Sequence, residues 1–178
     1  MNANGILAGE EVTIDTRRKP LGNTGGSVLA QAAMQISCGL LENNGGRLQA
    51  GGNLRIDTRG QPLHNRYTGN TGIQCGADLF LDAGEVDNMA GMISAAGTTQ
   101  IDGGALKNSE GKLTTAQSMK LMTRSLENQG EVCRPVRCSL SLPARWIIAP
   151  AASSPPERPI SKAGSLIIAG DVCRREAI

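Results

Sequence analysis

Apolar residues alternate with polar or small residues over short stretches of this chain. The clearest positions at steps of two are Leu48 and Ala50, Leu54 and Ile56, Leu79 and Leu81, and Met119 and Leu121. A step of two places every second side chain on one face of a β-strand. Gly and Asn, which tolerate the positive φ of tight corners, separate these runs. The pattern therefore predicts short strands with one buried face, joined by tight turns.

The runs return at a nearly fixed period. The stretch Leu41 to Asp57 reads L-x-N-x-x-G-x-L-x-A-G-x-x-L-x-I-D, and two of its columns recur along most of the chain. The first pairs an apolar residue with an asparagine two positions later: Leu21/Asn23, Leu41/Asn43, Leu63/Asn65, Val86/Asn88, Leu106/Asn108 and Leu126/Asn128. The second is aliphatic: Ile14, Ile36, Ile56, Leu81, Ile101 and Leu121. Successive members are 20, 22, 23, 20 and 20 residues apart in the first column, and 22, 20, 25, 20 and 20 in the second.

A shared period near 20 residues is typical of a solenoid, in which each repeat buries its apolar face against the next. Combined with the strand alternation, it predicts an all-β fold: a parallel β-helix with about 20 residues per coil over residues 1–131. In the first coil we expect Ile6, Ala8, Val12 and Ile14 to face inward.

The L-x-N-x-x-G columns resemble the haemagglutinin repeat of filamentous-haemagglutinin-type adhesins. These are long exoproteins of two-partner secretion systems, in a family shared with contact-dependent growth inhibition effectors. The resemblance covers about residues 2–131. It implies a right-handed β-helix shaft, in agreement with the general handedness of parallel crossovers. It also implies adhesion or toxin presentation rather than catalysis.

For the parent protein, the resemblance further implies export through an outer-membrane two-partner-secretion transporter. The parent would be secreted or held on the outer cell surface, where it meets a host or neighbouring cell. The stretch Met1 to Asp15 lacks the basic, apolar and cleavage regions of a signal peptide. We therefore expect this chain to begin within the array and to be a fragment of a longer shaft.

Composition agrees with a narrow shaft. The 178 residues include 23 glycines but a single Trp, Tyr and Phe, and the net charge is +2. Scarce aromatic residues and a small mixed charge argue against nucleic-acid binding. No apolar run reaches the length of a transmembrane helix.

Two polar columns are candidates for sites. Amides stacked coil on coil would bond one another and the corner backbone, so we expect Asn23, Asn43, Asn65, Asn88, Asn108 and Asn128 to form a structural ladder. The outward column Asp15, Asp57, Asp82 and Asp102 could hold Ca²⁺ or act as acid and base in a carbohydrate-active β-helix enzyme. Ser37 and Met122 interrupt it, and we expect no metal, cofactor or catalytic site there.

Residues 59–76 contain about five residues more than the period requires and predict a loop. Loops on a rigid scaffold often carry function, so His64, Arg66, Tyr67 and Asn70 could form a binding patch; a tolerated insertion is the alternative. The two-residue expansion at Arg17, Arg18, Lys19 and Pro20 predicts a solvated corner. Cys38 and Cys75 occupy different columns, which argues against a disulfide between them.

Composition changes after Glu131. Residues 132–178 hold six of the eight prolines, three of the five cysteines and the only Trp. We expect an irregular or disordered tail, because proline cannot donate to a central ladder. A small domain stapled by Cys133, Cys138 and Cys173 is the alternative.

The 20-residue period continues in this tail although the L-x-N motif does not. Two similar phrases lie one period apart, Trp146-Ile147-Ile148-Ala149 and Leu166-Ile167-Ile168-Ala169. Read in another frame, permissible codons for both phrases encode L-D-N-R. A frame slip near residue 132 would explain the lost motif and the retained period together. The chain would then be a frameshifted shaft fragment or a non-functional gene remnant, and the nucleotide sequence past Glu131 tests this hypothesis.

Overall fold

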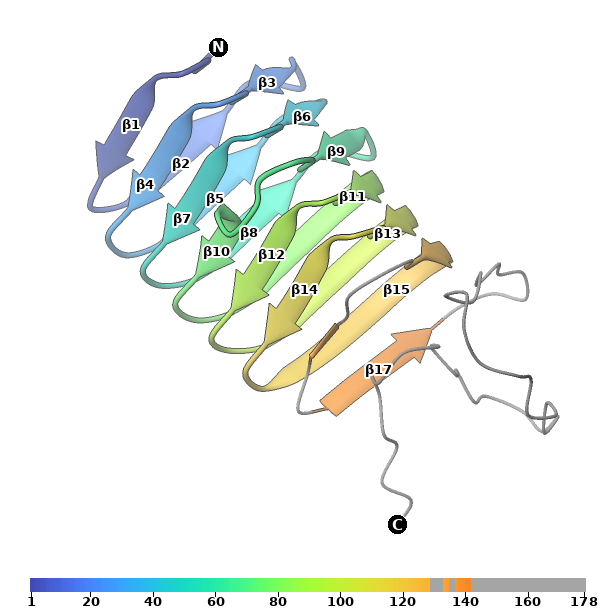
Figure 1. Cartoon of the computed structure of the whole chain (residues 1–178). Helices are drawn as coiled ribbons and strands as arrows, with labels where there is room; N and C mark the ends of the chain where they lie inside the picture. Colours follow the sequence, from blue (N-terminus) through green and yellow to red (C-terminus); the bar gives the residue numbers. More distant parts are fainter. Residues whose placement is uncertain (129–132, 135–136, 142–178) are drawn as a thin grey trace, which may run out of the picture.

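The computed structural model describes residues 1–128, 133–134 and 137–141. Throughout this part the chain forms parallel strands that wind into a right-handed solenoid of about six coils, about 20 residues apart (Figure 1). The predicted all-β parallel β-helix is confirmed. The described residues contain no helix long and apolar enough to cross a membrane.

One row of strands forms the first face of the shaft. Hydrogen bonds join its members in parallel along the axis, coil to coil. The row consists of β1 (Ile6–Gly9), β4 (Ser27–Ala30), β7 (Arg47–Ala50), β10 (Gly72–Cys75), β12 (Met92–Ala95), β14 (Lys112–Thr115) and β16 (Cys133–Arg134).

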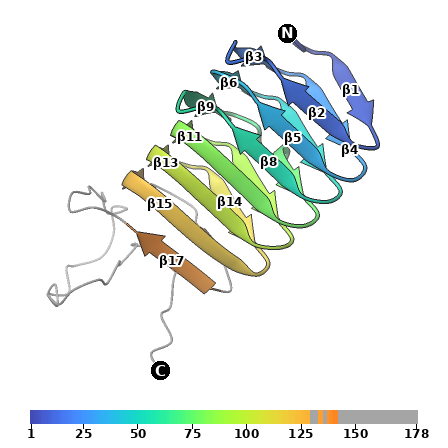
Figure 2. The same ribbon diagram turned by 180° about the vertical axis from the view of Figure 1, so that it is seen from behind.

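A second row covers the opposite side (Figure 2). It consists of β2 (Val12–Asp15), β5 (Met34–Ser37), β8 (Leu54–Asp57), β11 (Leu79–Asp87), β13 (Thr99–Lys107), β15 (Ser118–Glu127) and β17 (Arg137–Ser141). A short third row, β3 (Leu21–Gly22), β6 (Leu41–Glu42) and β9 (Pro62–His64), closes the early coils and pairs with the end of β11. We number the coils from the N-terminus, so that coil 1 contains β1 to β3 and coil 6 contains β14 and β15.

The strand register reproduces both predicted columns. In the first column Leu21 pairs with Leu41, and each further member pairs with the next along the chain as far as Leu126. The aliphatic column likewise runs in register from Ile14 to Leu121. Both columns are buried after coil 1, because each coil covers the side chains of its neighbours.

The first coil differs from the prediction by one residue. Leu7 and Gly9 pair with the buried Val28 and Ala30, so they occupy the inward column, whereas Ile6 and Ala8 align with outward positions. The expectation that Ile6 and Ala8 face inward was therefore wrong. The run Ile-Leu-Ala-Gly is apolar or small throughout, so no alternation of polar and apolar residues shows which side chains face inward.

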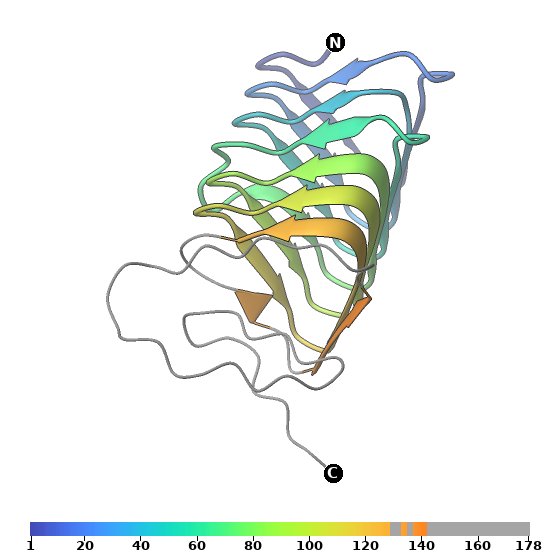
Figure 3. The ribbon, with the colours of Figure 1, turned by 90° about the vertical axis from the view of Figure 1, so that its right-hand side faces the viewer.

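The extra residues of the predicted loop are divided between two corners. Two of them extend the corner at Thr58 to Gln61, before β9, and three extend the turn between β9 and β10. The single loop predicted over 59–76 is thus two separate excursions with a strand between them. The first has a counterpart at Thr16 to Pro20 in coil 1, and both project from the same edge of the shaft (Figure 3).

Strand pairing continues past the predicted boundary at residue 131. Strand β16 pairs with β14, and β17 pairs with β15 with Leu140 opposite Leu121, so the start of the expected tail joins both rows. Neither β16 nor β17 contains a proline, so every residue of β17 has a backbone N–H to donate to the ladder. Residues 142–178, which form most of the predicted irregular tail of residues 132–178, lie outside the described residues.

Candidate functional site

The asparagine column forms a continuous row of hydrogen bonds inside the shaft. The Nδ2 of each asparagine donates to the Oδ1 of the asparagine in the next coil, at 2.7 Å from Asn23 to Asn43 and at 2.6 to 2.7 Å in the four later links as far as Asn128. All six side chains are buried. Asn2 adds a seventh member, because its Nδ2 donates to Asn23 Oδ1 at 2.7 Å. Its distance of 21 residues from Asn23 could have revealed it in the sequence.

Most of these amides, those of Asn2, Asn23, Asn43, Asn88 and Asn108, also donate to the turn that they close. Asn88 Nδ2, for example, donates to the carbonyl of Gly91 at 3.3 Å and to that of Lys112 in the following coil at 3.2 Å. The glycine three positions after the asparagine has a steric cause. A Cβ on Gly46 or Gly111 would lie closer than 3.0 Å to the asparagine carbonyl of the coil below. In the motif L-x-N-x-x-G, the asparagine therefore places its amide inside the corner. The glycine lets the backbone pack closely against the asparagine carbonyl of the preceding coil.

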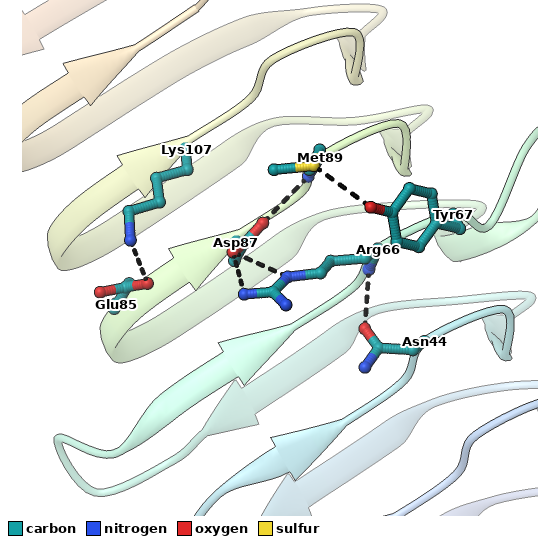
Figure 4. Close-up of polar contacts among 7 residues, drawn as sticks. All are labelled: Asn44, Arg66, Tyr67, Glu85, Asp87, Met89 and Lys107. Atoms are coloured by element: carbon teal, nitrogen blue, oxygen red, sulfur yellow. Dashed lines mark hydrogen bonds and ion pairs between the residues drawn. The ribbon is translucent and has the colours of Figure 1, made fainter.

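The four residues of the predicted binding patch do not share one surface role. His64 ends strand β9 and is half-buried, whereas Arg66 and Tyr67 open the following turn. Asn70 is exposed, and its Oδ1 accepts from Lys112 Nζ at 3.1 Å. Tyr67 is 66% exposed and has a positive φ of 55°, and its hydroxyl donates to Met89 Sδ at 3.5 Å (Figure 4).

Arg66 is engaged by a buried carboxylate. Its Nε and Nη2 donate to Asp87 Oδ2 at 2.8 and 2.5 Å, and Asp87 is only 1% exposed (Figure 4). Burial opposes ionisation of Asp87, but hydrogen bonds from Arg66 and from the Met89 amide outweigh it and lower the pKa of the carboxyl. Lys107 and Glu85 form a similar link one coil further, at 2.8 Å. These pairs join neighbouring coils, and they leave Tyr67 as the largely exposed aromatic group of this face.

The acidic column points outward, as expected, but it does not assemble a site. Asp57, Asp82 and Asp102 pair in register on successive coils, and Ser37 takes the equivalent place between Asp15 and Asp57. Partial burial, and then the carboxylates on either side, raise the pKa of Asp82. No group of three or more His, Cys, Asp or Glu side chains that could hold a metal ion occurs in the described residues.

An open groove of about 570 Å³ runs beside this column. Four of its nine lining residues are glycines, and a Cβ on Gly84 or Gly104 would meet a backbone carbonyl of the preceding coil. Asp102 is the one carboxylate among the residues that line the groove. Most glycoside hydrolases use a pair of carboxyl groups across the scissile bond, and the lining of this groove supplies one.

Cys38 and Cys75 are free and buried. Burial, and then the Asp57 carboxylate, raise the pKa of the Cys38 thiol to about 11. Burial also raises the pKa of Cys75. A thiol that stays protonated at neutral pH is a poor nucleophile, so neither residue forms a reactive site.

The haemagglutinin repeat family matches residues 2–61 and 66–121. The chain belongs to this family. The unmatched residues 62–65, between the two matched segments, lie between the two excursions around β9. No significant match was found among curated proteins or among solved structures. Family and fold together define a haemagglutinin-type repeat protein, in a family whose members are secreted or exposed on the cell surface, and they favour a structural over an enzymatic role.

Proposed function

We propose that residues 2–128 form a shaft segment of an adhesin exported by two-partner secretion, which holds other parts of the protein away from the cell surface. The uninterrupted amide row from Asn2 to Asn128 carries this proposal. It runs inside the shaft, it satisfies its own hydrogen bonds, and it fixes each coil on the next.

Such a row supports mechanical continuity rather than chemistry. Backbone hydrogen bonds of both strand rows run along the axis, so the shaft lengthens by about 4.8 Å with each coil and stays narrow. The ion pairs Arg66–Asp87 and Lys107–Glu85 also cross from coil to coil. A scaffold of this kind suits the presentation of an adhesive tip or of a growth-inhibition toxin.

Export tests the proposal. The full chain is fused behind the secretion domain of a two-partner system and co-expressed with the matching outer-membrane transporter. We expect the fusion to reach the outer surface and to become accessible to added protease. A transporter mutant that does not open serves as the control.

Retention of a folded fusion in the periplasm would contradict the proposal. The enzymatic alternative is tested on the purified chain by the release of reducing ends from a panel of polysaccharides. We expect none. Release that Asp102→Asn abolishes would establish an enzyme instead.

A further inference from the structure

Two corners on one edge of the shaft project beyond the others (Figure 3). Both belong to the sequence Ile-Asp-Thr-Arg-x-x-Pro-Leu, at residues 14–21 and 56–63. In coil 1 the Lys19 amide donates to Thr16 O at 3.1 Å, and in coil 3 the Gln61 amide donates to Thr58 O at 3.0 Å. We call residues 16–20 the basic turn and residues 58–61 the reference turn. The two turns share this closing hydrogen bond and differ in charge.

The other coils are recessed at this edge. In coil 2 residues 38–40 join β5 directly to β6, and in coils 4, 5 and 6 the strands β11, β13 and β15 continue through the corner. The Gly84 amide donates to Gln61 O at 3.0 Å, so the recess of coil 4 lies directly beside the reference turn. The groove of about 570 Å³ extends from Gly60 of this turn to Arg124 of coil 6. The edge therefore projects at coils 1 and 3 and recedes at coils 2 and 4.

The basic turn carries positive charge that the described part of the chain does not neutralise. Arg17, Arg18 and Lys19 are adjacent and exposed, and none of them forms an ion pair with any described residue. The equivalent arginine of the reference turn, Arg59, lies 4.0 Å from the Asp57 carboxylate of its own coil. The cations of the basic turn are thus available to another molecule.

The backbone of the basic turn is strained where that of the reference turn is not. Both central residues of each turn have positive φ, 52° and 66° at Arg17 and Arg18, and 53° and 77° at Arg59 and Gly60. Glycine adopts this conformation freely, whereas a residue with a side chain does so at a cost. Strain that the surrounding structure maintains is typical of functional positions.

Carboxylates without a cation lie along the recessed part of the edge. Asp82 in coil 4 and Asp102 in coil 5 are exposed, and neither forms an ion pair with a described residue. Partial burial, and then the carboxylates of Asp57 and Asp102, raise the pKa of Asp82. A cation placed beside these side chains would offset their repulsion. One edge thus carries a projecting positive turn and, three coils further, a recessed negative surface.

We propose that this edge binds a second copy of the chain in antiparallel orientation, with a two-fold axis that crosses the edge between coils 2 and 3. Coil 1 of each copy then lies opposite coil 4 of the other, and coil 2 lies opposite coil 3. Each projecting turn meets a recessed corner, and each basic turn approaches Asp82 and Asp102 of the second copy. The same contact forms twice, so the pair is closed.

Shape and charge together select this register. Two copies that ran parallel with this edge in common would place turn against turn and cation against cation. An antiparallel pair with coil 1 opposite coil 6 would also interdigitate, but Met122 and Arg124 replace the carboxylates there. The inference goes beyond the shaft function and does not depend on export.

Reversal of charge on each side of the contact tests the proposal. The first variant combines Arg18→Glu with Lys19→Glu, and the second combines Asp82→Lys with Asp102→Lys. The control combines Lys120→Glu with Arg124→Glu, at exposed positions in coil 6. Sedimentation velocity of the full chain measures association at low and at high ionic strength, and circular dichroism shows that each variant is folded.

We expect the native chain to dimerise at low ionic strength and to dissociate as salt screens the exposed charges. Each reversed variant alone should associate at least about tenfold more weakly, since two attractive contacts become repulsive. An equimolar mixture of the two reversed variants should recover the native association, because both contacts of the mixed pair then join opposite charges. The control should associate as the native chain does.

Zero-length carbodiimide cross-linking tests the register. Coils 1 and 4 of one chain are about 14 Å apart along the axis, at about 4.8 Å per coil, which is farther than a lysine side chain spans. We expect peptide mapping of the cross-linked dimer to join Lys19 to Asp82 or Asp102. Such a link reports a contact between two copies.

Four results would overturn the proposal: a native chain that stays monomeric at low ionic strength, association that salt does not weaken, equal association of the native and reversed chains, or no recovery in the mixture. The same loss in the control, or cross-links of the dimer that do not involve the basic turn, would overturn the assigned register. All of these are measured on purified protein, so they are independent of the export assay.

Discussion

Removing one amide from the middle of the asparagine row should destabilise the whole shaft. In Asn88→Ala four hydrogen bonds disappear: the donation from Asn65, and those to Asn108, Gly91 and Lys112. A typical net contribution is about 1 kcal/mol per bond, and a buried acceptor left without a donor costs about 1–3 kcal/mol. We therefore expect Asn88→Ala to lower the free energy of unfolding by about 3–4 kcal/mol.

Urea denaturation followed by far-ultraviolet circular dichroism measures this loss. Asn2→Ala is the matched control, because Asn2 is half-buried at the end of the row and water can replace its bonds. We expect it to cost about 1 kcal/mol. Equal losses in the two variants, or a loss in Asn88→Ala of less than about 1 kcal/mol, would refute the structural role of the row.

Asn88→Asp keeps the shape of the side chain and changes its chemistry. A carboxylate there would face Asn108 Oδ1, which lies 2.6 Å from the present amide nitrogen, in a buried position. Burial and this repulsion raise the pKa of the introduced carboxyl above its unfolded value. The variant should be least stable above that folded pKa and should regain stability as the pH falls, because the protonated acid again donates.

Three further outcomes follow from individual contacts. Gly46→Ala forces a Cβ against the Asn23 carbonyl and should cost several times more in urea denaturation than Gly45→Ala, where φ is +60° but the space is open and the cost is about 1 kcal/mol. Arg66→Ala should lower stability at neutral pH by about 1 kcal/mol, after allowance for the partial exposure of Arg66. In the native chain this contribution is present above the unfolded pKa of the aspartate and is lost as the pH falls through its lowered folded pKa; denaturation midpoints that show the same acid dependence with and without Arg66 would contradict this. Cys38 should resist alkylation at neutral pH in the folded protein and react after unfolding, as peptide mapping would show.

The period and the register could be predicted because they depend on residue types that repeat. Asn and Gly at fixed spacing have one physical use in a stacked corner, so the columns ran from Leu21 to Leu126 as expected. The first coil could not be placed by alternation, since Ile6 to Gly9 offers no polar residue to mark the outer face. Asn2 would have placed it, because in the coils without an extended turn the inward residue follows its asparagine by five positions, as Val28 follows Asn23 and Leu48 follows Asn43.

The spacing of residues in the sequence does not determine which contacts they make with other coils. The segment around β9 is longer than the repeat period requires, so the sequence shows that it contains extra residues. Where these residues lie depends on which part of the segment pairs with β11, and that pairing divides them between two corners. The engagement of Arg66 depends on Asp87, which is 21 residues away and belongs to another coil. The left-handed backbone conformation at Arg18 could not be predicted either, because arginine is not a residue type that indicates a positive φ.

The amide row has a direction. Every link donates from the earlier coil to the later one, so an oxygen faces one end of the shaft and an N–H the other. A coil inserted in the same orientation finds a donor on one side and an acceptor on the other, whereas an inverted coil would oppose oxygen to oxygen. Duplication or loss of one whole repeat therefore preserves every bond, and genes of this kind can vary the reach of their product in steps of about 20 residues without redesigning its interior.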